Sequence, residues 1–321
     1  MSSAPSATPP GDTPAAGKRS RAVRRPGDLA FSGLSLGSAL LILAILAGVA
    51  LFLVTEALPA LTADPADVSG GEGFFAYVWP LVAGTVIASL IAMIVATPVA
   101  VGIALFISHY AQPRVGKTVG FIVDLLAAVP SVVFGMWGLQ VFAPQMAKLY
   151  AWLAEHASWF PLFGEDASAS GRTLLTAALV LAVMILPIIT SVSREVFLQT
   201  PKLHEEAALA LGATKWEVIK TAVLPFGTPG IIGGTMLGLG RALGETMAVA
   251  IILSVGGFSW NLIESGNSTI PAEIALNFPE ASGLRLAELI AAGLVLFCIT
   301  LAVNLFARWI VEKRSEFSGA N

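Results

Sequence analysis

Residues 201–225 of the chain read PKLHEEAALALGATKWEVIKTAVLP, a polar segment that lies between two long apolar stretches. Thr200, just before it, can cap a helix whose first residue is a proline, and Gly212 can end that helix. Thr214 and Glu217 form the capping-box pattern that opens a second helix, which must stop before the second proline. The segment therefore predicts two short helices that meet at a glycine bend.

The apolar stretches on both sides belong to a series of long intervals without charged residues. The chain is 56% hydrophobic and only 12% charged, against roughly 25% charged residues in an ordinary soluble domain. About 20 apolar residues are needed to cross a bilayer as a helix. The intervals predict an all-α polytopic membrane protein with six transmembrane helices, at about 31–57, 79–108, 118–145, 172–196, 227–254 and 285–311.

Prolines divide two of these intervals. In 73–113, Pro80 and Pro98 leave two alternatives, a short interfacial piece followed by one span or a single span, and we favour the single span. In the third span, Pro130 frees a backbone carbonyl that Ser131 or a neighbouring helix must satisfy. A bent or broken helix is expected there, either as a packing kink or as a polar lining to a path.

Lysine and arginine set the orientation, since basic residues near span ends stay in the cytoplasm. With both termini inside, only Lys148, Arg172 and Arg285 of the 18 basic residues would lie outside. The polar segment then faces the cytoplasm. Residues 1–28 are a basic tail too poor in apolar residues to fold alone, 29–312 form the membrane domain with 197–225 as its cytoplasmic loop, and 313–321 form a second cytoplasmic tail.

Two charged residues, Arg241 and Glu245, lie inside the fifth predicted span. Charges in a membrane cost about 2.5–3.5 kcal/mol each on insertion scales, so they need a compensating role. Their four-residue spacing places them on one helical face. Either they neutralise each other, or Arg241 meets an anion that Glu245 holds and tunes. Gly230, Gly234 and Gly238 would let a neighbouring helix approach closely.

The cytoplasmic segment resembles the "EAA" loop by which membrane subunits of ABC importers engage their ATPases. The resemblance rests on the order and spacing of Glu206, Ala207, Ala208, Gly212, Leu224 and Pro225. Ala222 departs from it, because that family usually has isoleucine there. The resemblance implies that these six residues couple the chain to an ATPase. A connector lying on the bilayer surface is the alternative.

Three runs together resemble the PstC-type permease subunits of bacterial phosphate ABC importers: RALGETMAV at 241–249, PSVVFGMWGL at 130–139, and REVF at 194–197 followed by the EAA-like loop. The similarity covers about residues 30–312. It implies a type I ABC importer permease (MetI-like) fold in the bacterial inner membrane. By the same resemblance, Arg241 and Glu245 fall where that family has charged residues needed for phosphate passage. We expect Ser131 and Thr246 to lie on the substrate path with them.

The same resemblance implies the partners. They are a PstA-type second permease, two PstB-type ATPase subunits and a PstS-type phosphate-binding protein, besides membrane lipid and without nucleic acid. The chain itself would be no enzyme, would bind no cofactor, and would rely on ATP used by its partners. Sulfate or molybdate importer permeases are the alternative within the class. A secondary anion transporter is the alternative outside it, but that would require an inverted repeat, which the sequence lacks.

Other candidate sites are weaker. Gly116, Lys117 and Thr118 match the end of a phosphate-binding loop, but its first glycine is missing and no strand precedes it. The three histidines, His109, His156 and His204, are scattered over different loops. We therefore expect no metal site, and we interpret these histidines as solvent or interface residues.

Overall fold

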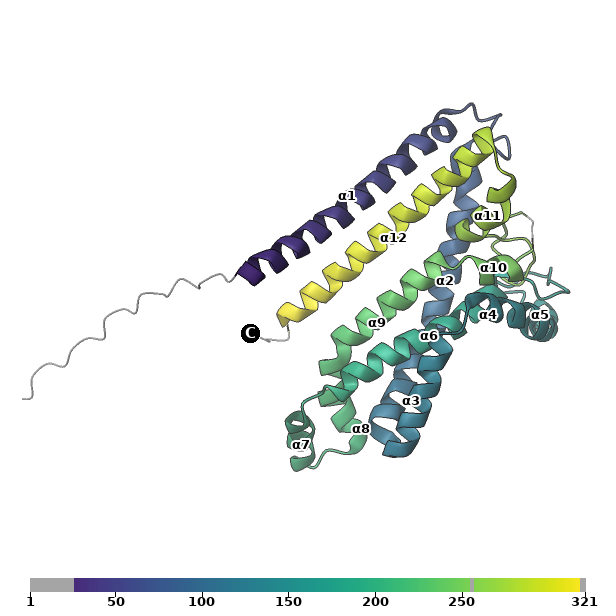
Figure 1. Ribbon diagram of the computed structural model, residues 1–321. Coiled ribbons are helices and arrows are strands. Elements are labelled where there is room, and N and C mark those ends of the chain that lie inside the picture. Colours follow the sequence, from purple (N-terminus) through teal and green to yellow (C-terminus); the bar gives the residue numbers. More distant parts are fainter. Residues whose placement is uncertain (1–25, 255–256, 318–321) are drawn as a thin grey trace, which may run out of the picture. The chain divides into compact units, whose positions relative to one another are not determined.

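The computed structural model describes residues 26–254 and 257–317, and every regular element in these ranges is helical (Figure 1). The predicted all-α class is therefore confirmed for the described part. Residues 1–25 and 318–321 of the two predicted tails lie outside it. The last helix runs to Phe317, so the start of the predicted second tail is helical.

By their contacts the residues form two units, Met1–Leu51 and Phe52–Asn321. The described part of the first unit belongs to α1 (Pro26–Thr62), and its side chains from Phe31 to Val49 are exposed. A helix that is apolar on all sides and has no buried face fits hydrocarbon rather than water.

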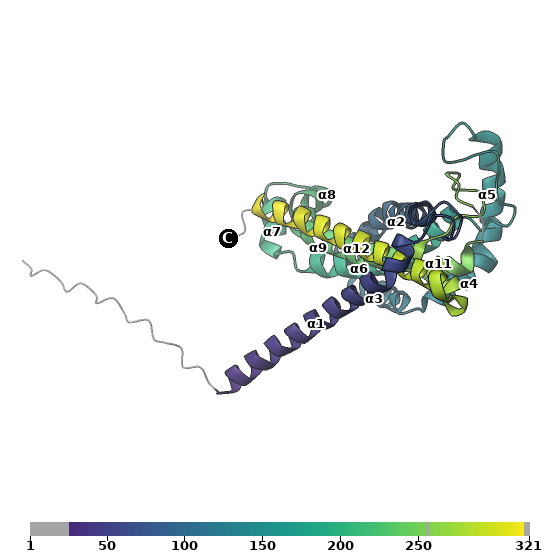
Figure 2. The same ribbon diagram turned by 90° about the horizontal axis from the view of Figure 1, so that it is seen from above.

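The second unit contains the end of α1 and all later helices. These are α2 (Phe74–Leu105), η1 (Phe106–Tyr110), α3 (Pro113–Ala127), α4 (Ser131–Trp137), η2 (Gly138–Phe142), α5 (Ala143–His156), α6 (Leu174–Leu198), α7 (Lys202–Ala210), α8 (Lys215–Val218), η3 (Ile219–Val223), α9 (Leu224–Gly244), α10 (Met247–Ile252), α11 (Ile270–Asn277), η4 (Phe278–Glu280) and α12 (Gly283–Phe317). Viewed from above, α7 and α8 lie at one end of this unit and α5 at the other (Figure 2).

Five helical segments in the described ranges are long and apolar enough to cross a membrane: Ala30–Thr62, Phe74–Tyr110, Leu174–Leu198, Lys215–Gly244 and Gly283–Trp309. A sixth candidate is the pair Pro113–Ala127 and Ser131–His156, bent by 92°. The bend falls just before Pro130, which disfavours helical geometry in the residue preceding it. The predicted break in the third span is thus confirmed. In contrast, α2 runs unbroken through Pro80 and Pro98, so the alternative of a separate interfacial piece is wrong.

Helix α6 is the most buried of the candidate spans and packs most extensively against α2 and α9. Toward this core α2 presents a stripe of alanines spaced four residues apart, all at most 1% exposed: Ala88, Ala92, Ala96, Ala100 and Ala104. Small residues at this spacing let two membrane helices approach closely.

The glycines of α9 serve the same purpose on the other side of α6. A Cβ added to Gly238 would lie 2.9 Å from Ile189, and one added to Gly234 would lie 3.1 Å from Val192. The predicted close approach at these glycines is therefore confirmed, and the neighbour is α6.

At the end opposite α7, a buried charge network joins α12, α11, α2 and the loop before α2. The guanidinium of Arg285 donates to Glu288 at 2.9 Å, to Glu273 at 2.8 Å and to Ser69 Oγ at 3.0 Å, and it lies over the ring of Tyr77. Glu288, which is 1% exposed, also accepts hydrogen bonds from Ser69 N at 3.0 Å and Ser69 Oγ at 2.6 Å. Every charge in this network is paired by hydrogen bonds, as a structural ion pair requires.

Candidate functional site

The fifth predicted span, 227–254, is not one helix. Helix α9 ends at Gly244, Glu245 has an extended backbone (φ −69°, ψ 123°), and α10 begins only at Met247. The two charged residues of the span therefore stand at its break, with Arg241 in the last turn of α9 and Glu245 directly after it. In Figure 1, α10 follows α9 next to α11.

The two charges at the break form a loose ion pair. Arg241 Nη2 lies 3.8 Å from Glu245 Oε2, and the side chains are 42% and 6% exposed, respectively. The other oxygen of Glu245 accepts a hydrogen bond from Ala248 N at 3.3 Å, in the first turn of α10. The carboxylate is thus buried and held by α10, whereas the guanidinium is half exposed.

The Arg285 network shows how this chain builds a structural ion pair, and the Arg241 site differs from it. Arg285 donates three hydrogen bonds of 2.8–3.0 Å. Arg241 donates none to any residue in the described ranges. A guanidinium carries five N–H donors, so Arg241 keeps its donors available for an anion. Gly240 and Gly244 leave open space beside it, since a Cβ added to either would meet nothing within 4 Å.

The second broken helix crosses the first. Helix α4, which begins after the break at Pro130, packs against α10. A Cβ added to Gly135 would lie 2.8 Å from Ala248 Cα. Ser131 begins α4, and Thr246 immediately precedes α10 and donates to Gly244 O at 3.1 Å. Both predicted path hydroxyls therefore stand where a helix restarts, but within the described residues no hydrogen bond joins Ser131 to the other three predicted path residues.

The crossing at Gly135 leads to a prediction. Gly135→Ala is expected to destabilise the protein by about 1–3 kcal/mol, because the added methyl group overpacks backbone against backbone. Gly233→Ala is the matched control, since a Cβ there meets nothing within 4 Å. Thermal unfolding of the purified variants measures the difference. Equal melting temperatures for the two variants would contradict the close crossing of α4 and α10.

Arg172 stabilises the C-terminal end of α10 through hydrogen bonds. From the sequence it was predicted only as an outer basic residue. Its guanidinium donates to Ile252 O at 3.1 Å and to Leu253 O at 2.7 Å. These are carbonyls at the C-terminus of α10, which that helix leaves unsatisfied. No local signal in the sequence connects Arg172 to α10, because the partners are backbone atoms far along the chain.

The polar segment 201–225 forms the first predicted helix as α7 and begins the second as α8. The prediction that the second helix stops before Pro225 is wrong, because α8, η3 and α9 form one helical segment, Lys215–Gly244. Pro225 lies in the first turn of α9, directly after the π-helical stretch η3, which accommodates a residue without an N–H group.

Gly212 has φ +83°, a left-handed conformation typical of the residue after a helix, and Thr214 forms the predicted capping box with Glu217. The predicted Thr200 cap is wrong: α7 has no side-chain cap, and the buried Thr200 hydroxyl has no hydrogen-bond partner in the described ranges. Thr200 packs inward instead, two residues before α7 begins.

Helix α7 presents an open face. None of its residues is buried, and Leu203 is 73% exposed. Leu211, directly after the helix, is 90% exposed. Among the predicted coupling residues, four are exposed and two are partly buried. Glu206, Ala207, Gly212 and Pro225 are exposed, and Ala208 and Leu224 are partly buried. Four of the six residues thus lie on α7 and the bend that follows it, and Leu224 and Pro225 are the first two residues of α9.

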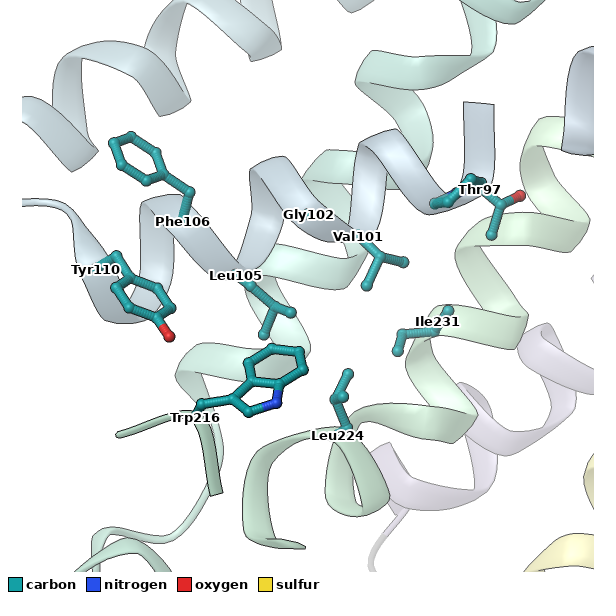
Figure 3. Close-up of a pocket in the computed structure, with 10 residues that line it drawn as sticks. Thr97, Val101, Gly102, Leu105, Phe106, Tyr110, Trp216, Leu224 and Ile231 are labelled. Atoms are coloured by element: carbon teal, nitrogen blue, oxygen red, sulfur yellow. The ribbon is translucent and has the colours of Figure 1, made fainter. Parts of the chain in front are cut away.

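Next to this element, a hollow of about 590 Å³ separates the end of α2 from α8 and α9 (Figure 3). It is lined by Thr97, Pro98, Val101, Gly102, Leu105, Phe106, Tyr110, Trp216, Leu224 and Ile231. The lining is almost wholly apolar and contains no charged side chain. It offers a phosphate few donors, so the Arg241 break is the better candidate for an anion site.

A family model described as "Binding-protein-dependent transport system inner membrane component" matches residues 96–316. The chain belongs to this family. The permease is 44% identical over 303 residues to the "Phosphate transport system permease protein PstC 2" of Mycobacterium tuberculosis, covering 90% of this chain and 93% of that protein. It is 40% identical over 246 residues to the "Phosphate transport system permease protein PstC" of Pasteurella multocida, covering 74% and 75%.

A solved structure shares the fold of the permease. A chain of a bacterial ABC transporter involved in the import of the acidic polysaccharide alginate superimposes with a TM-score of 0.61 at 17% sequence identity, covering 89% of this chain and 96% of that one. The type I ABC importer permease fold is thus confirmed. As a family member, the permease is a multi-pass inner-membrane component and a transport subunit rather than an enzyme, and it works with an ATPase and a binding protein.

Proposed function

We propose that the chain is the permease subunit of an ATP-driven importer that moves inorganic phosphate across the cytoplasmic membrane. The relatives that match most of its length are phosphate permeases by name. A sulfate or molybdate importer permease would share the fold, and the named relatives favour phosphate over these. A secondary anion transporter is disfavoured by the family and by the exposed two-helix element, which such a transporter does not need.

One observation carries the proposal: Arg241 presents a half-exposed guanidinium that makes no hydrogen bond to any of the described residues, at a break inside a membrane span. Phosphate entering the span loses hydration, and charge-assisted hydrogen bonds from a guanidinium replace it. Glu245, held at the start of α10, keeps Arg241 from binding the anion too tightly to release. Ser131 and Thr246 would add hydroxyl donors where α4 and α10 begin.

The orientation and partners follow from the same proposal. Both termini and the α7–α8 element face the cytoplasm, where two PstB-type subunits bind and hydrolyse ATP; the permease itself binds no cofactor. A PstA-type permease completes the membrane unit, and a PstS-type protein delivers phosphate outside. Exposed acidic residues such as Asp166 and Glu165 on the outer loops would repel free phosphate, so delivery by a binding protein suits this surface.

In the proposed cycle, closure of the ATPase dimer pulls on α7 and α8. The pull is transmitted through η3 to α9, because Lys215–Gly244 is one continuous helical segment that ends at the Arg241 site. Movement at the cytoplasmic end is therefore transmitted directly to the break. The cavity opens outward, accepts phosphate beside Arg241, and opens inward when the ATPase resets.

Uptake into proteoliposomes containing the assembled complex tests this function. ATP-dependent accumulation of radiolabelled phosphate that excess sulfate does not inhibit is expected. Competition by sulfate would favour the sulfate alternative, and accumulation that needs no ATPase subunits would favour a secondary transporter.

The exposed face of α7 and the adjoining Leu211 lead to a separate prediction. Leu211→Asp, at the most exposed position of the α7 element, is expected to reduce co-purification of the ATPase subunit at least about tenfold, because it places a charge in an apolar contact. Trp159→Asp is the matched control, since Trp159 is 80% exposed at the opposite end. Quantitative pull-down from membranes with equal permease content measures the loss. Full retention of the ATPase by the Leu211 variant would contradict the docking role of this face.

A further inference from the structure

Helix α7 is poorly attached to the rest of the bundle. It has no buried residue, and its packing is chiefly against α8 and η3, the elements that follow it in the chain. The hollow of Figure 3 lies between α8 and the end of α2, and beside it Ala104 and Leu105 of α2 pack against η3. No residue of α7 belongs to this apolar cluster, so a direct link from α7 to α2 needs another contact.

One polar contact supplies this link. His109 Nε2, in the last turn of η1, lies 3.7 Å from Glu205 Oε1 on α7, and the two side chains are 13% and 28% exposed. Because η1 directly continues α2, the contact joins α7 to the helix that packs most extensively on α6. Sequence reasoning treated His109 as a solvent or interface residue. No sequence pattern connects it to its partner Glu205, which lies on a distant segment.

The hydrogen bonds around His109 orient its ring. Ser108 Oγ lies 2.7 Å from His109 Nδ1 and 2.8 Å from Ala104 O, so Nδ1 is held on the side of η1. The other ring nitrogen, Nε2, then faces the carboxylate of Glu205. An Nε2–H group in this position points its hydrogen at a carboxylate oxygen, which accepts.

We propose that His109 is a positioning residue that ties the coupling helix α7 to α2 through Glu205. The inference rests on the proposed coupling role of α7 and adds a second route for its movement, besides the covalent route through α8 and α9. ATPase-driven displacement of α7 would act on α9 through the chain and on α2 through the His109–Glu205 pair. Both helices flank α6, so the two routes would move them together.

Charge exchange in the assembled complex tests the proposal. His109→Glu and Glu205→Lys alone are each expected to lower the phosphate transported per ATP hydrolysed by at least about threefold to fivefold, the size of one partly exposed ion pair. The double variant, with the charges exchanged, is expected to recover to within about twofold of the original ratio. His156→Glu, an exposed histidine at the opposite end, is the control and should leave the ratio unchanged.

Two milder variants keep the test valid where a reversed charge prevents assembly. His109→Lys supplies a positively charged donor to Glu205 and should retain coupling, whereas His109→Leu, which has no donor, should lose it to the same extent as Glu205→Leu. Single variants with unchanged ratios, or a double variant no better than the worse single one, would overturn the inference while leaving the proposed function intact. Absence of ATP-dependent uptake in the unmodified complex would overturn the proposed function and this inference with it.

Discussion

Cells that depend on Arg241→Gln as their phosphate permease are expected to take up phosphate at least about 30-fold more slowly than cells with the original chain. Removing one charged partner of a desolvated anion costs about 2–5 kcal/mol, and about 2 kcal/mol is a factor of about 30. The free energy of unfolding should change little, because Arg241 is 42% exposed and its contact with Glu245 is 3.8 Å long. Initial rates of radiolabelled phosphate uptake at matched membrane abundance measure the effect.

Two controls separate the role of Arg241 from general damage. Arg241→Lys keeps the charge without the planar fork of donors and should retain part of the uptake. Arg308→Gln removes an exposed arginine of α12 and should change nothing. Uptake by the Arg241→Gln variant within about threefold of the original would return Arg241 and Glu245 to a mutually neutralising structural pair.

Arg285→Met is expected to show the opposite pattern, a large loss of stability. It removes the partner of Glu288, which is 1% exposed, and of Glu273. Breaking a buried ion pair by removing one partner typically costs about 3–5 kcal/mol, because the remaining charge is buried without compensation. Thermal unfolding of the purified permease, followed by loss of tertiary signal, should show a clear fall in melting temperature.

The matched control for Arg285→Met is the double variant Arg285→Met/Glu288→Met. Replacing both partners with apolar side chains removes the buried Glu288 charge and leaves only Glu273, which is 20% exposed, without its cation, so part of the lost stability should return. A double variant as unstable as the single one would show that the network contributes through packing rather than through charge. Together with Arg241→Gln, these variants separate a charge that serves transport from one that holds the fold.

Much of the fold could be predicted from the sequence because its signals are local. Charge-free intervals located the helices, Pro130 predicted the bend, and Gly212 with Thr214 predicted the two-helix element. The break after Gly244 could not be predicted in this way. No proline marks it, and the structure maintains it through distant contacts, namely α4 against α10 and Arg172 on the carbonyls of Ile252 and Leu253.

The candidate site shows the same division. Arg241 and Glu245 were evident as charges inside an apolar stretch, since the membrane makes such charges costly. The difference in their exposure was not evident, because four-residue spacing predicts a closed pair on one helix. In the structure the break turns Glu245 toward α10. The predicted Thr200 cap was wrong for a related reason. The hydroxyl suits a helix cap locally, but packing around α6 buries it.

In the proposed function, ATP hydrolysis in the partner subunits moves phosphate past Arg241 in this chain. The most direct test measures phosphate uptake and ATP hydrolysis together in proteoliposomes that contain the complex with Arg241→Gln. We expect phosphate-loaded binding protein still to stimulate hydrolysis while uptake is lost, so that the phosphate moved per ATP falls at least about 30-fold, as for the loss of one charged contact. An unchanged ratio of phosphate to ATP would contradict the proposed function.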